Sequence, residues 1–127
     1  MTLTPSAARA ETITVGTGND ARAIAVLLRD AGGAADPARP ALVWLGGYRS
    51  DMTGTKAVEM DALAAEQGLC AIRFDYSGHG ASGGAFRDGT ISRWLEEALA
   101  VLDHVAPTSV VLVGSSMGGW IALRLAQ

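Results

Sequence analysis

The hydrophobic and polar positions of the 127-residue chain divide it into alternating strands and helices. Residues 11–15 alternate between polar and apolar side chains, which is typical of a half-buried strand. Residues 21–31 follow a turn at 16–20 and are predicted to form its antiparallel partner. Residues 41–45, ALVWL, are apolar throughout, which favours a strand buried on both faces of a sheet.

The rest of the chain is predicted to alternate between two more strands and three helices. The strands cover residues 69–74 and 109–113, and the helices cover residues 54–68, 90–105 and 117–127. In the second helix, apolar residues recur at i, i+3, i+4 and i+7, the pattern of a helix packed on a sheet. Thr55 is expected to cap the first helix, and Gly68 to take the left-handed position after its end. The order predicts an α/β protein with a mostly parallel sheet and flanking helices.

The composition narrows the class of protein. The chain is 49% hydrophobic and 18% charged, which is the balance of one globular domain. Its net charge of -3, without a basic cluster, argues against binding to nucleic acid. Residues 32–40 are predicted to form a surface loop, and Cys70 a buried thiol.

No segment of the chain has the features of a membrane span or a signal peptide. Apolar runs stay below the roughly 18 to 20 residues of a membrane helix, and residues 1–15 lack an apolar core. A cytoplasmic protein without a membrane span is therefore expected. No cluster of His, Asp and Glu has the spacing of metal ligands, so neither a metal nor a cofactor is expected.

Residues 114–118, GSSMG, match the Gly-x-Ser-x-Gly pattern of a nucleophile elbow. They follow the predicted strand 109–113 directly and lead into an apolar helix. Ser116 is therefore expected at a sharp strand-to-helix turn, with a strained backbone and an exposed hydroxyl. Side chains at Gly114 and Gly118 would collide with this turn. The alternative is a glycine turn without a catalytic role.

A second segment, residues 80–84, also matches Gly-x-Ser-x-Gly, and it serves as an internal comparison. It lies well beyond the nearest predicted strand, and no helix begins after it. Ser82 is therefore interpreted as a loop serine. Its context, and not its pentapeptide, distinguishes it from Ser116.

An acyl-transfer site also needs two N–H donors for the oxygen of the tetrahedral intermediate. The backbone N–H of Met117 is expected to provide one of them. The second donor is expected in residues 46–57, the loop after the third strand, and we assign it to the N–H of Tyr48. Gly46 and Gly47 would let this backbone approach a substrate closely. An ordinary glycine turn is the alternative for this loop as well.

Three motifs occur in a characteristic order: LGGYRSDMTGTKA, AIRFDYSGHGASGG and VLVGSSMGGWIAL. Together they resemble the branch of the α/β-hydrolase superfamily that includes the mitochondrial palmitoyl-protein thioesterase, also known as mycophenolic acid acyl-glucuronide esterase, and its bacterial relatives. The resemblance covers about residues 41–125. It implies a serine hydrolase acting on thioesters or carboxylic esters of small molecules or acylated proteins. Ser116 would be its nucleophile, and Tyr48 and Met117 its oxyanion donors.

The resemblance also implies a strand order and exposes one departure. Members of the superfamily place their strands in the order 1-2-4-3-5-6-7-8, of which this chain supplies strands 1 to 5. Many members open the oxyanion loop with His-Gly, where this chain has Gly46-Gly47. A backbone donor remains compatible with that difference.

The chain lacks an acid and a base after the serine, where the order Ser, Asp or Glu, His requires them. Residues 117–127 contain no such side chain. His79, near Asp75, is interpreted as shaping its loop, and His104 as a helix-end residue. We therefore expect residues 1–127 to be the N-terminal part of a single truncated α/β-hydrolase domain, inactive by itself. The alternative is a non-catalytic fragment, or one half of a split hydrolase that needs a complementary C-terminal chain.

Overall fold

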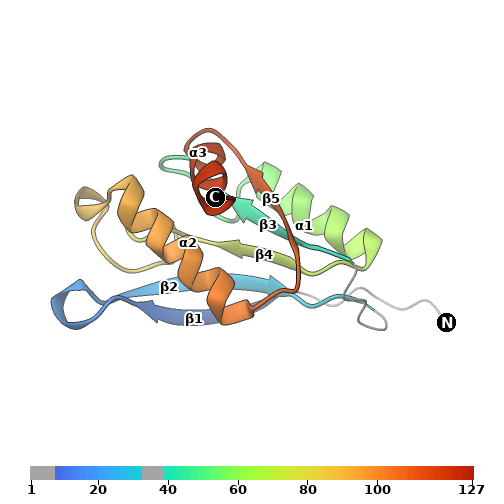
Figure 1. Ribbon diagram of the computed structural model, residues 1–127, viewed down its shortest axis with the longest axis horizontal. Coiled ribbons are helices and arrows are strands. Elements are labelled where there is room, and N and C mark those ends of the chain that lie inside the picture. The colour runs from blue at the N-terminus through green and yellow to red at the C-terminus, as the bar shows by residue number, and fades with distance from the viewer. Residues whose placement is uncertain (1–7, 33–38) are drawn as a thin grey trace.

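The computed structural model describes residues 8–32 and 39–127, which form a five-stranded sheet with helices on both faces (Figure 1). The strands are β1 (Arg9–Val15), β2 (Arg22–Arg29), β3 (Ala41–Leu45), β4 (Ala71–Phe74) and β5 (Val110–Gly114). The α-helices are α1 (Thr55–Gln67), α2 (Ile91–Val105) and α3 (Met117–Leu125). Two 3-10 helices, η1 (Gly18–Asp20) and η2 (Phe86–Asp88), were not predicted. Most of the predicted loop at 32–40, and the first seven of residues 1–15, lie outside the described residues.

The sheet has the strand order β1-β2-β4-β3-β5, which confirms the order implied by the family resemblance. β2 pairs antiparallel with both β1 and β4, whereas β3 pairs parallel with β4 and β5. β2 is thus the strand that runs against the others. The predicted α/β class is confirmed.

The helices cover the two faces of the sheet separately. In Figure 1, α2 and α3 lie on the near face and α1 on the far face. On the α2 and α3 side, the core contains Val26, Val43, Ile72, Trp94, Val101 and Ile121. On the α1 side, it contains Leu42, Trp44, Ala57, Met60, Ala64 and Ala71. Every residue of β3 is buried because both faces are covered, as its uninterrupted apolar pattern predicted.

The observed helix ends agree only partly with the ends predicted from the sequence. Gly68 ends α1 in the left-handed conformation, with φ of 68°, as predicted. The predicted cap of α1 is wrong: Gly54 occupies the N-cap position, and Thr55 is already the first helical residue. At α2, the N-cap residue Thr90 accepts a hydrogen bond at its side chain from the backbone N–H of Arg93 at 3.0 Å.

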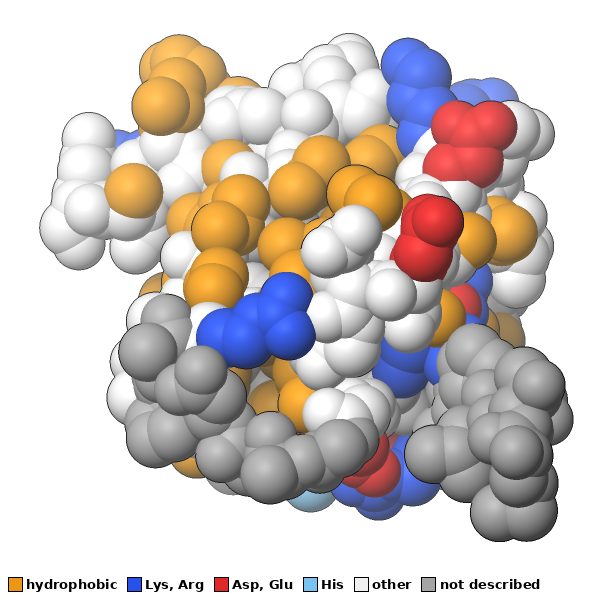
Figure 2. Space-filling view, turned by 90° about the vertical axis from the view of Figure 1, so that its right-hand side faces the viewer, with side chains coloured by type: hydrophobic (Ala, Val, Ile, Leu, Met, Phe, Trp, Pro, Cys, Tyr) orange, Lys and Arg blue, Asp and Glu red, His pale blue; other side chains and the backbone are white. Residues whose placement is uncertain are grey.

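β5 forms an open edge of the sheet. It pairs with β3 on one side, and on the other side no strand from residues 8–32 or 39–127 pairs with it. Val110 and Val111 are 37% and 45% exposed, and on the neighbouring α3 Trp120 and Leu123 are 57% and 64% exposed. Figure 2, which views the molecule from the right of Figure 1, shows apolar side chains gathered in the middle of that face. A strand edge of this kind leaves backbone groups that another strand can bind.

Candidate functional site

Ser116 lies in the turn that connects the end of β5 to the start of α3. Its backbone has φ of 55° and ψ of -117°, a conformation that non-glycine residues rarely adopt. Such strain costs of order 1–3 kcal/mol and persists only where the surrounding structure imposes it. The residue is exposed, so its hydroxyl is accessible at the head of the helix. The strained turn and the exposure agree with the sequence prediction.

Gly114 and Gly118 make this turn sterically possible. A Cβ added to Gly114 would lie 2.4 Å from the carbonyl oxygen of Gly118. A Cβ added to Gly118 would lie 1.8 Å from the carbonyl oxygen of Leu45 at the end of β3. Side chains at these positions would therefore collide with the turn, as predicted.

The loop after β3 approaches Ser116 closely. A Cβ added to Gly47 would lie 3.6 Å from the Cβ of Ser116 and 3.3 Å from the carbonyl oxygen of Ser115. Tyr48 follows in this loop, and Met117 is the first residue of α3. The backbone N–H groups of Tyr48 and Met117 donate to no acceptor within residues 8–32 and 39–127. The structure thus brings the loop of Tyr48 alongside Ser116 and Met117.

Two hollows border this region. One of about 260 Å³ is lined by Trp44, Gly47, Ser50, Ser115 and the start of α1. Another of about 380 Å³ is lined by Arg49, Asp51, His79 and Phe86. A larger hollow of about 540 Å³ is lined by Ala41 and Ser109, at the opposite end of β3 and β5, and by Cys70 and His104. We place the candidate site at the first hollow, because Gly47 and Ser115 line it and both adjoin Ser116. The second hollow lies further along the same loop, at Arg49.

The predicted buried thiol and the second histidine both lie near that larger hollow. Cys70 is only partly buried, and this burial raises the pKa of its thiol. His104 contacts Glu11, with 2.9 Å between Nε2 and a carboxylate oxygen. Neither Cys70 nor His104 lines the two hollows beside the loop of Tyr48.

Asp75 and His79 do not form an acid–base pair, although the sequence places them close together. Asp75 accepts the backbone N–H groups of Met52 at 2.7 Å and Ala81 at 2.8 Å. Burial raises the pKa of the Asp75 carboxyl, and these two N–H groups oppose the rise. The Nε2 of His79 accepts the backbone N–H of Arg49 at 3.1 Å. Both side chains therefore hold the backbone of the loop after β3, a role that sequence analysis missed.

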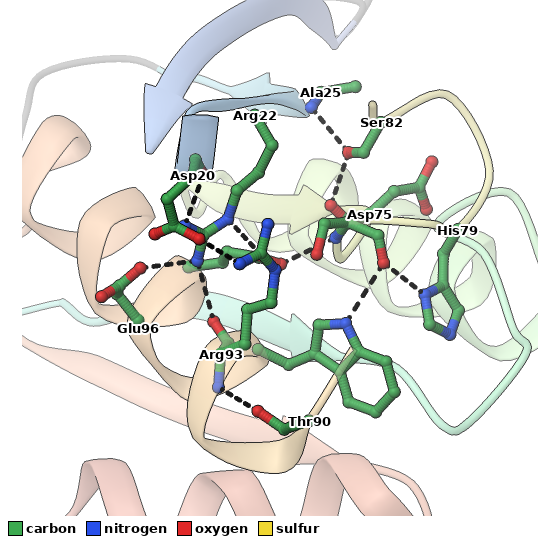
Figure 3. A network of polar contacts seen from close by, with 12 residues as sticks. Asp20, Arg22, Ala25, Asp75, His79, Ser82, Thr90, Arg93 and Glu96 are labelled. Carbon is green, nitrogen blue, oxygen red and sulfur yellow. Dashed lines mark hydrogen bonds and ion pairs between the residues drawn. The ribbon is translucent and has the colours of Figure 1, made fainter. Parts of the chain in front are cut away.

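Ser82 has a different environment from Ser116. Its hydroxyl donates to the carbonyl oxygen of Asp75 at 2.6 Å and accepts the backbone N–H of Ala25 at 2.9 Å (Figure 3). It thereby joins β2 to the glycine-rich loop after β4. This placement agrees with the interpretation of Ser82 as a loop serine.

A buried ion pair also supports the glycine-rich loop after β4, and it was not predicted from the sequence. Arg22 on β2 and Glu97 on α2 are paired at 2.8 Å, with side chains 1% and 0% exposed. Glu97 also accepts the backbone N–H of Ser77 at 2.7 Å. Figure 3 shows how Arg22 and its partners Asp20 and Glu96 adjoin the loop that carries Asp75 and His79. The pair could not be predicted because Arg22 and Glu97 lie far apart in the sequence.

The fold and the strand–turn–helix geometry around Ser116 define the class of protein. Residues 25–127 match the alpha/beta hydrolase family, and the chain belongs to that family.

Particular relatives can be compared in more detail. A proposed hydrolase from Agrobacterium vitis S4 is 72% identical, with a TM-score of 0.88, over 93% of this chain and 44% of that chain. Mouse alpha/beta hydrolase domain-containing protein 10 superimposes with a TM-score of 0.78 and 33% identity, over 91% of this chain and 44% of its own. In sequence, the mouse mitochondrial palmitoyl-protein thioesterase ABHD10 is 42% identical over 87 residues, 68% of this chain and 29% of the relative. The chain therefore spans less than half of these relatives.

The comparisons correct one prediction. A cytoplasmic protein was expected, and this is wrong, because the curated relatives are mitochondrial proteins. Across the described part of the chain, no helix is long and apolar enough to cross a membrane. The same residues contain no group of three or more His, Cys, Asp or Glu side chains arranged to hold a metal ion.

Proposed function

We propose that this chain carries the nucleophile and the oxyanion hole of a serine hydrolase that cleaves thioesters or carboxylic esters. The observation that carries the proposal is the strained, exposed position of Ser116 at the head of α3, beside the loop of Tyr48. Membership of the alpha/beta hydrolase family supports the same chemistry.

In this proposal, the Oγ of Ser116 attacks the carbonyl carbon of the substrate. The negative oxygen of the tetrahedral intermediate accepts hydrogen bonds from the backbone N–H groups of Tyr48 and Met117. Each such donor contributes about 3 to 4 kcal/mol to the stability of the transition state. The positive end of the α3 dipole adds to this stabilisation. The thiol or alcohol leaves, and water then hydrolyses the acyl-serine.

The general base and its orienting acid are proposed to come from residues outside this chain. Within the described residues, both histidines are engaged elsewhere: His79 with Arg49 and Ser77, and His104 with Glu11. We propose that residues 1–127 form the N-terminal part of one α/β-hydrolase domain. The open edge of β5 is where the complementary part would pair, whether in the same polypeptide or in a separate one. Without that part the chain is expected to be inactive.

The names of the relatives support a proposal for the class of substrate. The mouse and human proteins are palmitoyl-protein thioesterases. We therefore propose an acyl thioester or a carboxylic ester of a small molecule or an acylated protein as the substrate. A non-catalytic fragment is the second candidate, and the observation that favours it is that His79 and His104 both contact residues other than Ser116.

A chimera provides a direct test. Residues 1–127 of this chain would be joined to the C-terminal remainder of the Agrobacterium vitis protein, which is 72% identical over the matched part. The chain alone and the chimera would each be treated with a fluorophosphonate probe and assayed with a p-nitrophenyl ester and an acyl thioester. We expect the chimera to be labelled and active, and the chain alone to show weak or no labelling.

Ser116 and Ser82 share the same pentapeptide pattern, so substituting each of them provides the control. Ser116→Ala should abolish labelling and hydrolysis by the chimera, whereas Ser82→Ala should leave both in place. Labelling that persists in Ser116→Ala would overturn the assignment of the nucleophile. Strong ester hydrolysis by the chain alone would overturn the need for a complementary part. A folded chimera that is never labelled would favour the non-catalytic fragment.

A further inference from the structure

The loop of residues 46–54, which we call the oxyanion loop, is held by two side chains of the glycine-rich loop after β4. Asp75 binds the backbone N–H of Met52 at 2.7 Å, and His79 binds that of Arg49 at 3.1 Å. Arg49 directly follows Tyr48 in the chain. The bond from His79 therefore restrains the peptide plane on the C-terminal side of Tyr48, the residue proposed to donate an N–H to the oxyanion.

The two contacts of the imidazole define its protonation. The Nδ1 of His79 lies 3.0 Å from the carbonyl oxygen of Ser77, which can only accept, so Nδ1 carries a proton. The Nε2 faces a backbone N–H, which can only donate, so Nε2 carries no proton. Both hydrogen bonds are satisfied only by a neutral ring in the Nδ1–H form.

The ring of His79 has little freedom to move. It is 4% exposed, and its centroid lies 5.2 Å from that of Trp94 and 5.3 Å from that of Phe86. The carbonyl oxygen of Ser77 also accepts the indole N–H of Trp94 at 3.2 Å, and the Ser77 N–H donates to the buried Glu97. The hydrogen bond to Ser77 and the packing against Trp94 and Phe86 therefore fix the ring of His79.

The oxyanion loop needs such support because its backbone is strained at Arg49. This residue has φ of 63°, in the left-handed region that non-glycine residues avoid. Its guanidinium carbon lies 4.8 Å from the centroid of the Phe86 ring, which gives a second contact to the glycine-rich loop.

We propose that His79 is a positioning residue: its Nε2 holds the N–H of Arg49 and thereby directs the N–H of Tyr48 toward the substrate carbonyl. The catalytic part of this inference rests on the proposed function, whereas the structural part does not. A purely structural His79 would act through its aromatic packing alone. Three substitutions separate these two roles.

His79→Phe keeps an aromatic ring among Trp94 and Phe86 and removes both nitrogens. His79→Gln places a carbonyl acceptor near the position of Nε2, and His79→Asn places a donor only near Nδ1. Melting temperatures of all three variants, in the chain and in the chimera, identify any that fail to fold. The Gln and Asn variants both carry a polar amide and are similar in size, so they form a matched pair.

The first measurement is independent of catalysis. Amide hydrogen exchange of the chain should show that the Arg49 N–H is protected in the wild type and in His79→Gln. The protection should fall about tenfold or more in His79→Phe and His79→Asn. The ring ¹⁵N spectrum should show the neutral Nδ1–H form of His79. Equal protection of Arg49 in the wild type and the Phe variant would overturn the inference, whatever the activity.

The second measurement uses the chimera. His79→Phe and His79→Asn should lower kcat about tenfold with KM unchanged, and His79→Gln should recover most of the loss. Equal activity of His79→Phe and the wild type would show that packing alone matters and would overturn the positioning role. Failure of the proposed function gives a different result, because labelling would then survive in Ser116→Ala while the exchange of Arg49 still depended on residue 79.

Discussion

The Cα of Gly118 packs against the carbonyl oxygen of Leu45, so closely that an added Cβ would lie 1.8 Å from that oxygen. Leu45 ends β3 and Gly118 lies in the first turn of α3. The contact therefore brings the start of this helix against the strand that leads into the oxyanion loop. Gly119, the next residue, has open space, since the nearest atom to an added Cβ is 4.0 Å away.

Gly118→Ala should therefore destabilise the protein, whereas Gly119→Ala should not. The clash at residue 118 is with backbone, which cannot move aside as a side chain can, so the free energy of unfolding should fall by about 3 kcal/mol. Gly119→Ala removes a flexible residue from a helix and should raise the free energy of unfolding by up to about 1 kcal/mol. Urea unfolding of both variants measures the difference. Equal effects would mean that the close approach at Gly118 is absent.

The regular elements of this chain were predictable because burial leaves a clear pattern in the sequence. β3 is buried on both faces and has no polar residue, and α2 repeats its apolar residues at helical spacing. The short helix η2 was missed, because three residues are too few to show a period. Thr55 was wrongly predicted as a cap, since the chain enters the helix one residue earlier, at Gly54.

The candidate site was predictable only where neighbours in sequence determine it. Ser116 and Ser82 share a pentapeptide pattern, and the strand before Ser116 and the helix after it distinguished the two. The role of His79 could not be predicted, because its partner Arg49 lies thirty residues away. Contacts of this kind depend on which loops the sheet order places side by side, and no local pattern records them.

The hydroxyl of Ser82 should stabilise the fold without contributing to catalysis. Ser82→Ala removes the partner of the Ala25 N–H and of the Asp75 carbonyl oxygen, so the free energy of unfolding should fall by about 1 to 3 kcal/mol. Ser92→Ala, at an exposed position of α2, should change it by less than about 0.5 kcal/mol. Chemical unfolding monitored by circular dichroism measures both. A neutral effect of Ser82→Ala would contradict the observed bridge between β2 and the loop.

Glu97 should be far more important for stability than its neighbour Glu96, although both bind Arg22. The Glu97 side chain is fully buried, whereas that of Glu96 is 57% exposed. Glu97→Gln leaves the buried Arg22 without its closest buried counter-charge and should lower the free energy of unfolding by about 3 kcal/mol. Glu96→Gln should cost less than about 1 kcal/mol, because water screens an exposed pair. Thermal melting of both variants measures the difference. A similar loss of stability in the two variants would contradict the importance of burial.

Asp61 on α1 should make the stability of the protein depend on acid. Arg29 on β2 donates two hydrogen bonds to it, at 2.9 and 2.8 Å, and these hold the pKa of Asp61 below its usual range. Burial opposes this shift, and the charge of Arg73 adds to it. The folded state thus stabilises the ionised carboxylate of Asp61 more than the unfolded chain does. The resulting stabilisation is complete above the unfolded pKa and is lost as the pH falls through the lower, folded pKa.

The wild type should therefore lose stability between about pH 5 and pH 2, and Asp61→Asn should lose less over that range. At pH 7 the variant should be less stable by about 2 kcal/mol, because a charged hydrogen-bonded pair is lost. The two unfolding curves should approach one another as Asp61 becomes protonated in the wild type. Asp103→Asn, an exposed change on α2, is the control and should leave the pH dependence as it is. Urea unfolding at several pH values tests this, and a constant difference between wild type and Asp61→Asn down to pH 2 would contradict it.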